Sequence, residues 1–179
     1  EMVAEIVDGE RHASPRPGFP HANAATSLGG FIGGPYHHGR GGPGGWIILY
    51  EPEVHLGRHV LVPDLAGWRR SRMPVLPDGV FTTLSPDWVC EVSSPSTASL
   101  DRVKKLAIYA RAEVAYAWLV DPLARTLEVL RLDNGRWTIL ATHAGDDVVG
   151  AEPFGDMELE LRALWGDDAG DPAGQANRT

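Results

Sequence analysis

The chain has 179 residues, 43% hydrophobic and 22% charged, a balance typical of a globular protein with a sizeable core. No apolar run approaches the roughly 18 residues that a membrane-spanning helix needs, and no basic-then-apolar secretory signal is recognisable. The formal net charge of −8 argues against an extended basic surface for nucleic acid, but it leaves room for a small basic cleft or a carboxylate-lined site whose metal ions carry positive charge.

The composition also bounds the organisation of the chain. The single cysteine, Cys90, excludes an internal disulfide and fits a reducing compartment, so we expect a cytoplasmic protein without a membrane segment. We expect one domain over residues 1–165, followed by a small, polar tail over residues 166–179 that is disordered. The sequence begins at Glu1 and not at methionine, so we expect a further N-terminal piece.

The first third of the chain predicts a hairpin, a helix and a loop. Residues 2–14 carry two short apolar-containing runs around Asp8-Gly9, a strong two-residue turn signal. Residues 20–32 have alanine and leucine at helical spacing, which predicts a helix. Glycine and proline dominate residues 33–45, which predicts a flexible loop.

The middle of the chain alternates short apolar runs with polar segments. We predict strands over residues 46–50 and 87–93, and a strand over residues 58–68 that Pro63-Asp64 interrupts. The proline-containing stretch 69–86 is expected to be a loop. Residues 99–112 predict a helix, with Thr97 or Ser99 as its N-cap.

The last third predicts three strands joined by turns, YAWLVD, TLEVLRL and RWTILAT. Residues 157–165 then form a last strand or a short helix. Several strands with one strong helix between two of them predict an α/β fold, with a central mixed β-sheet flanked by helices.

One charged residue inside a predicted strand carries most of the functional argument. Glu91 lies in the middle of the apolar run DWVCEVS, where burial of an unpaired carboxylate would cost several kcal/mol. Glu91 therefore needs a partner, or it binds something positive. Because side chains alternate along a strand, Cys90 points to the opposite face and is expected to be an inert core residue.

Two further residues complete a set with a recognisable chemistry. Asp64 follows a proline that breaks strand pairing, a place that can aim a side chain into a cleft. Asp101, Lys105 and Tyr109 form one stripe on the following helix. An exposed Asp101–Lys105 pair is the plain alternative. Two carboxylates from adjacent strands could hold Mg²⁺, and a lysine beside them could stabilise developing charge on a phosphate.

This pattern resembles the PD-(D/E)xK nuclease superfamily and, more closely, the restriction-endonuclease-like Uma-two family. No single matching piece is specific, but their order and spacing together are. The matching pieces are EIVDGE (5–10), PRPGFPH (15–21), VLVPDLAGW (60–68), PDWVCEVSSPST (86–97), DRVKKLAIYARA (101–112) and AYAWLVDP (115–122). The resemblance implies a restriction-endonuclease-like core and a Mg²⁺ or Mn²⁺ site held by the carboxylates of Asp64 and Glu91.

The sequence departs from the superfamily pattern at one position. Ser93 stands two residues after Glu91, where the superfamily has a lysine, and a serine cannot supply that charge. In the Uma-two pattern the lysine moves to the helix, at Lys105 in this chain. Lys104 points about 100° away around the helix and is the less suitable neighbour.

The same resemblance suggests accessory positions. Glu5 and His21 match family positions near the metal; otherwise they are a solvated hairpin residue and a polar group opening a helix. Ser93 and Asp101 complete the accessory set. Asp87 shares its strand with Glu91, so it is expected at the surface or at the strand start.

Three functions are compatible with this sequence. The leading one is a Mg²⁺-dependent endonuclease that hydrolyses phosphodiester bonds of nucleic acid, DNA rather than RNA, as a homodimer. The second is a catalytically inactive relative that serves as a binding or assembly module, which the charge of −8 and Ser93 favour. The third is a metal hydrolase acting on small phosphoesters.

Overall fold

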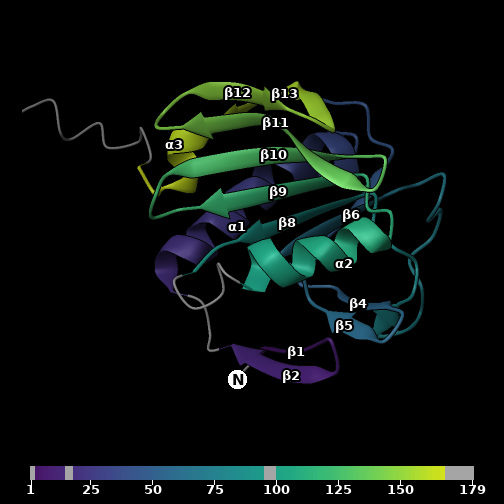
Figure 1. The fold of residues 1–179 in the computed structure, drawn as a ribbon. Helices are drawn as coiled ribbons and strands as arrows, with labels where there is room; N and C mark the ends of the chain where they lie inside the picture. Colours follow the sequence, from purple (N-terminus) through teal and green to yellow (C-terminus); the bar gives the residue numbers. More distant parts are fainter. Residues whose placement is uncertain (1–2, 15–17, 95–99, 168–179) are drawn as a thin grey trace, which may run out of the picture.

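A six-stranded sheet forms the centre of the protein (Figure 1). The computed structural model describes residues 3–14, 18–94 and 100–167. The sheet has the order β11-β10-β9-β8-β6-β3, and its neighbours are antiparallel except for the parallel pair β8–β9. Its strands are β3 (Trp46–Tyr50), β6 (Leu65–Arg69), β8 (Trp88–Val92), β9 (Tyr116–Asp121), β10 (Thr126–Asp133) and β11 (Arg136–Ala144). The predicted mixed sheet is confirmed.

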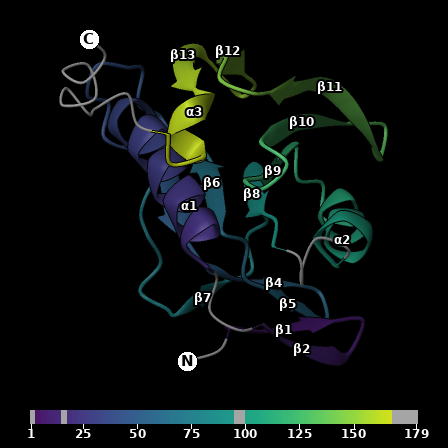
Figure 2. The same ribbon diagram turned by 90° about the vertical axis from the view of Figure 1, so that its left-hand side faces the viewer.

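Helices lie on both faces of this sheet (Figure 2). The helix α1 (Phe19–Ile32) covers one face and α2 (Leu106–Arg111) covers the other. The parallel strands β8 and β9 need a crossover connection, and α2 supplies it. A π-helical turn over Leu100–Lys105 precedes α2, so the predicted helix exists but its first turns are wider than an α-helix. The proposed N-cap residues, Thr97 and Ser99, lie outside the described residues.

The loop predicted over residues 33–45 is partly wrong. Its first five residues, Gly33–His37, continue α1 as a π-helical turn. Tyr36 is buried there and packs on Phe154, with 4.7 Å between the ring centroids. Burial of this aromatic ring outweighs the glycine and proline signals on either side of it.

A second, five-stranded sheet lies below the central one in Figure 1, in the order β2-β1-β5-β4-β7. Its strands are β1 (Val3–Val7), β2 (Glu10–Ser14), β4 (Glu53–Leu56), β5 (His59–Leu61) and β7 (Phe81–Thr82). The predicted N-terminal hairpin is confirmed, with φ of 53° at Asp8 and 83° at Gly9 in its turn. The predicted interruption at Pro63-Asp64 is confirmed, and it is the point where the chain passes from the second sheet into the central one.

The C-terminal segment contains both of the elements proposed for it. β12 (Val148–Ala151) pairs with β13 (Phe154–Glu160), and the helix α3 (Leu161–Leu164) follows directly. Residues 168–179, which include most of the predicted tail, lie outside the described residues. No helix in the described part of the chain is both long and apolar enough to cross a membrane.

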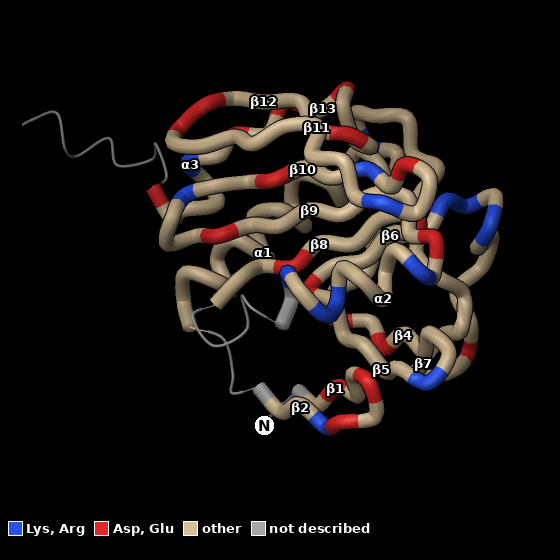
Figure 3. The backbone as a smooth tube through the Cα atoms, viewed as in Figure 1, with Lys and Arg blue, Asp and Glu red and all other residues tan. Residues whose placement is uncertain are grey.

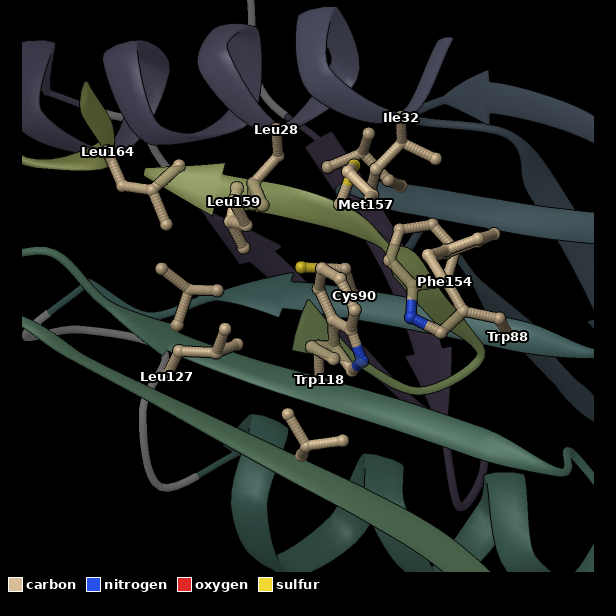
Figure 4. Close-up of a cluster of buried hydrophobic side chains, with 14 of the residues drawn as sticks. Leu28, Ile32, Trp88, Cys90, Trp118, Leu127, Phe154, Met157, Leu159 and Leu164 are labelled. Carbon is tan, nitrogen blue, oxygen red and sulfur yellow. The ribbon is translucent and has the colours of Figure 1, made fainter. Parts of the chain in front are cut away.

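The hydrophobic core is divided by the central sheet into two clusters. Trp88 and Cys90 of β8 pack on the α1 side, together with Phe154 and Leu159 of β13 (Figure 4). Val89 of β8 belongs to the cluster on the α2 side. The alternation predicted for this strand is therefore confirmed, and Cys90 is fully buried with a free thiol.

Candidate functional site

Glu91 is a buried carboxylate on the face of the central sheet that α2 covers. All five residues of β8 are buried, and Glu91 itself is only 2% exposed. Its strand neighbours on the other face lie in the apolar cluster beneath α1. A lone carboxylate in this position would be strongly destabilising, so its partners determine whether the strand can fold.

Two side chains from the following helical segment bind both oxygens of Glu91. Lys105 Nζ lies 2.9 Å from Oε2 and 2.9 Å from Oε1. The hydroxyl of Tyr109 donates a hydrogen bond of 2.5 Å to Oε1. Lys105 ends the π-helical turn and Tyr109 lies one α-helical turn later, so this spacing directs both side chains to the same carboxylate. Lys105 is thus buried, whereas the plain alternative placed it at the exposed surface of the helix.

Glu5 brings the N-terminal hairpin into the same cluster. Its Oε1 lies 3.0 Å from Lys105 Nζ and accepts a 2.8 Å hydrogen bond from the backbone N–H of Val62. Val62 follows β5 at the crossing between the sheets, where the strand ladder ends. Glu5 is 7% exposed, so it is not a solvated hairpin residue.

Asp64, on the other side of the crossing, also accepts a hydrogen bond from a backbone N–H group. The β6–β8 ladder ends at the Leu65–Cys90 pair, which leaves the N–H of Val92 facing β6 without a backbone acceptor. Asp64 Oδ2 accepts this hydrogen bond at 2.7 Å, and Oδ1 lies 3.0 Å from His21 Nε2 of α1. With 17% exposure, the Asp64 side chain is more accessible than those of Glu91 and Lys105.

Asp64 and Glu91 are the residues immediately beyond the Leu65–Cys90 pair that ends the β6–β8 ladder. Both carboxylates act on the same neighbour: after burial, the largest cause, the charges of Asp64 and then Glu91 raise the pKa of the Cys90 thiol. Among the described residues, no group of three or more His, Cys, Asp or Glu side chains is arranged to hold a metal ion.

Three other residues considered in the sequence analysis are Ser93, Lys104 and Asp101. The backbone N–H of Ser93 donates to the carbonyl of Val120, which continues the β8–β9 ladder. Lys104 points toward the hairpin instead, with Nζ 3.7 Å from Glu10 Oε2 and 41% exposure. The side chain of Asp101 lies outside the described residues.

The surface position proposed for Asp87 is wrong, although the strand-start position is right. Asp87 precedes β8 and is 9% exposed. Its Oδ2 accepts the backbone N–H of Arg69 at 2.8 Å, and its Oδ1 pairs with Arg72 at 3.0 Å. Asp87 thus accepts a hydrogen bond from the backbone N–H group at the end of β6, which is a structural role. In the sequence it lies four residues before Glu91.

Sequence reasoning placed Tyr109 on the lysine stripe but did not recognise it as a Glu91 donor. Its spacing of four residues from Lys105 was the available signal. A second ion pair between a carboxylate and a cation on the same face was also missed. Glu91 lies beside Leu119 of β9, which lies beside Glu128 of β10, and Glu128 Oε2 is 2.8 Å from Arg102 Nη1.

Comparison with known structures supports the fold. The chain is similar to a protein from Anabaena variabilis ATCC 29413 described as "a putative nuclease belonging to DUF820". The TM-score is 0.70 at 20% sequence identity, and the match covers 91% of this chain and 89% of that chain. The expected restriction-endonuclease-like fold is thereby confirmed.

Comparison of the sequence with protein families identifies its relatives. No curated protein matches the chain. The model of the Uma2 family, described as "Putative restriction endonuclease", matches residues 1–163 and so includes every residue of the candidate site. By this match over most of its length, the chain belongs to the Uma2 family of restriction-endonuclease-like proteins.

Proposed function

We propose that this protein is a divalent-metal-dependent nuclease that hydrolyses phosphodiester bonds in DNA, with Asp64 and Glu91 as the carboxylates that hold the metal. The observation that carries the proposal is the buried Glu91 bound by Lys105, beside a second carboxylate at the sheet crossing. The description of the Uma2 family supports nuclease activity in general. The metal and the preference for DNA are part of the proposal.

The donor chemistry of the two acidic residues fits Mg²⁺ or Mn²⁺. Mg²⁺ takes oxygen ligands and is commonly held by one or two carboxylates, with water and substrate phosphate as its other ligands. The side chain of Asp64 is the more accessible of the two, at 17% exposure, and the side chain of Glu91 is 3% exposed. A cation held by these groups would polarise a phosphate oxygen and make a water molecule more acidic.

The neighbouring side chains would hold the carboxylates in place and balance their charge. The single positive charge of Lys105 offsets part of the negative charge of Glu91 and Glu5, and it supplies the cation that Ser93 cannot. Tyr109 fixes the orientation of the Glu91 carboxylate, and His21 does so for Asp64. As charge develops on the phosphate oxygens, the ammonium of Lys105 would stabilise it electrostatically.

A binding module without catalysis is the second candidate, and two observations favour it. Both oxygens of Glu91 already have donors within the protein. Lys and Arg positions are interspersed with Asp and Glu positions along the described chain (Figure 3). If duplex DNA is cleaved on both strands, two sites are needed, and a twofold dimer would supply them.

A nuclease assay on several nucleic acids tests the proposal. The wild-type chain is incubated with single-stranded DNA, duplex DNA and RNA, each with Mg²⁺, Mn²⁺ or EDTA. We expect cleavage of DNA with either cation and none in EDTA. Absence of cleavage of every nucleic acid with both cations would favour the binding module.

A further inference from the structure

A cavity lies between α2 and the second sheet. It has a volume of about 430 Å³ and is open to solvent, within the size range of ligand pockets. Its walls come from the β4–β5 hairpin, from the segment after β7 and from the last turn of α2. None of the residues that hold Glu91 lines it, so it is separate from the candidate metal site.

The lining of this cavity is rich in cationic and donor groups. Arg58 and Arg111 contribute guanidinium groups, and Thr83 and Ser85 contribute hydroxyls. The buried side chain of Ile108 provides part of an apolar floor. No Asp or Glu is among the described lining residues, although the chain has 24 acidic and 16 basic residues. This local excess of positive charge favours an anionic ligand.

The charges facing the cavity are only partly compensated. Arg58 Nη2 lies 3.2 Å from Asp8 Oδ1, but their side chains are 72% and 44% exposed, so this pair is weak. Arg111 has no ion-pair partner within the described part of the chain. The Nδ1 atom of His59 accepts the N–H of Asp8 at 3.2 Å, so the neutral ring carries its proton on Nε2 as a donor. His55, also in the lining, is paired with Glu53 at 2.7 Å.

We propose that this cavity is a phosphate-binding subsite, in which Arg58 and Arg111 bind a backbone phosphate of a nucleic-acid strand. Guanidinium groups bind phosphate through paired, charge-assisted hydrogen bonds, and hydroxyl groups can add further ones. A free phosphorylated small molecule offers the same chemistry, and the experiment below distinguishes the two sources.

The position of the cavity relative to Glu91 supports a strand as the ligand, an argument that rests on the proposed nuclease function. Arg111 follows Lys105 by six residues on a helical segment, or about 9 Å along a helix axis. A nucleic-acid strand advances about 3.4 Å per nucleotide, so this distance corresponds to roughly three nucleotides. Six residues also turn the side-chain direction by about 120° around the helix, so a strand that reached both sites would have to curve around α2. The subsite would then position the strand while the carboxylate site acts on it.

The test measures binding of a fluorescent single-stranded DNA to the full chain in EDTA, over about 50 to 200 mM salt. The variants are Arg111→Glu and Arg58→Glu. The matched control is Arg40→Glu, an exposed arginine in the loop after α1, outside the cavity lining. Thermal melting of each variant verifies that it is folded. In parallel, a nucleoside 5′-monophosphate and inorganic phosphate are titrated into the wild type and the same variants by calorimetry.

We expect each cavity variant to weaken DNA binding by about tenfold or more, the scale of removing one charge-assisted hydrogen bond. The slope of log K against log salt should also fall by about 0.7 for each phosphate that the variant no longer binds. The control should retain both quantities near wild type. Equal DNA binding by cavity and control variants would overturn the nucleic-acid subsite.

The small-molecule titrations separate the remaining outcomes. If the monophosphate or inorganic phosphate binds and only the cavity variants fail to bind it, while DNA binding is unaffected, the ligand is a free phosphorylated molecule and the strand is excluded. If no probe distinguishes the cavity variants from the control, the subsite does not exist. Because EDTA prevents metal-dependent cleavage, failure here is independent of whether the wild type cleaves DNA with a metal.

Discussion

Lys105 and Glu91 form a buried ion pair in which Nζ lies 2.9 Å from each carboxylate oxygen, and each side chain is 3% exposed. Removing two charges from water is costly, and a buried pair often stabilises a fold no more than apolar residues of the same size would. The pair by itself is therefore weak evidence for a stabilising role, although removal of one partner alone would be strongly destabilising. It also links β8 to the helical segment that follows, and Glu5 extends the link to the N-terminal hairpin.

The first prediction concerns stability. Lys105→Met should lower the free energy of unfolding by about 3–5 kcal/mol, because it leaves buried carboxylates without their cation. Lys104→Met, the matched control, should change it by less than about 0.5 kcal/mol, because that side chain is 41% exposed and only loosely paired. Urea unfolding measures both values. Equal effects of the two substitutions would show that Lys105 is not the residue that neutralises Glu91.

The second prediction concerns Tyr109. Tyr109→Phe removes the hydroxyl that donates to Glu91 Oε1 and should cost about 1–3 kcal/mol, since a buried acceptor loses a donor. Tyr50→Phe is the control, because Tyr50 is 53% exposed and should tolerate the change. Thermal unfolding compares them. If Tyr109→Phe is as stable as its control, the hydrogen bond to Glu91 does not contribute to folding.

The third prediction concerns Cys90. Because the residue is fully buried, a thiol reagent should label it only as the protein unfolds, and fast labelling of the native protein would contradict the position of β8. Burial, with the charges of Asp64 and Glu91, raises the pKa of this thiol above its ordinary value of 9.0. The unfolded chain therefore loses this proton at lower pH than the folded chain does.

This difference gives the pH dependence a definite sign. The contribution of Cys90 to stability should be fully present below pH 9 and should be lost as the pH rises above it. Unfolding free energies measured across this range should fall more steeply for wild type than for Cys90→Ala. Parallel curves for the two proteins would contradict the raised pKa.

The residues of the site differ in how readily the sequence predicts them. The strand around Glu91 is a short apolar run, and its alternation correctly separates Glu91 from Cys90. Lys105 was identified through family resemblance, since local pattern alone favoured an exposed pair. The contact of Glu5 with Val62 joins residues 57 positions apart, and no periodicity in either segment indicates it.

The second sheet was missed for a related reason. Residues 58–68 look like one broken strand in the sequence, yet β5 and β6 belong to different sheets. Proline and aspartate signal the break but not the direction in which the chain continues. The strand-start position of Asp87 was predicted, but its burial was not, because a Pro-Asp pair gives no sign that the N–H of Arg69, on the neighbouring strand, needs an acceptor.

The fourth prediction concerns metal binding. Wild-type protein should bind Mn²⁺ weakly by calorimetry, because two carboxylates completed by water make an open site. Asp64→Asn should abolish the binding while preserving an acceptor for the N–H of Val92. Asp121→Asn is the control. The Asp121 carboxylate accepts hydrogen bonds from two backbone N–H groups in the turn after β9 and is not part of the candidate site. Undiminished Mn²⁺ binding by Asp64→Asn would place the metal elsewhere.

The most direct test of the proposed catalytic site compares Glu91→Gln with Glu128→Gln in metal-dependent cleavage of DNA. The two glutamates occupy the same row on the same face of the sheet, and each pairs with a cation from the segment before α2. If Glu91 acts in phosphodiester hydrolysis, Glu91→Gln should cleave about 10²-fold more slowly or worse, the scale of losing one electrostatic contribution, while Glu128→Gln should cleave like wild type. Cleavage by Glu91→Gln at the wild-type rate would contradict the account.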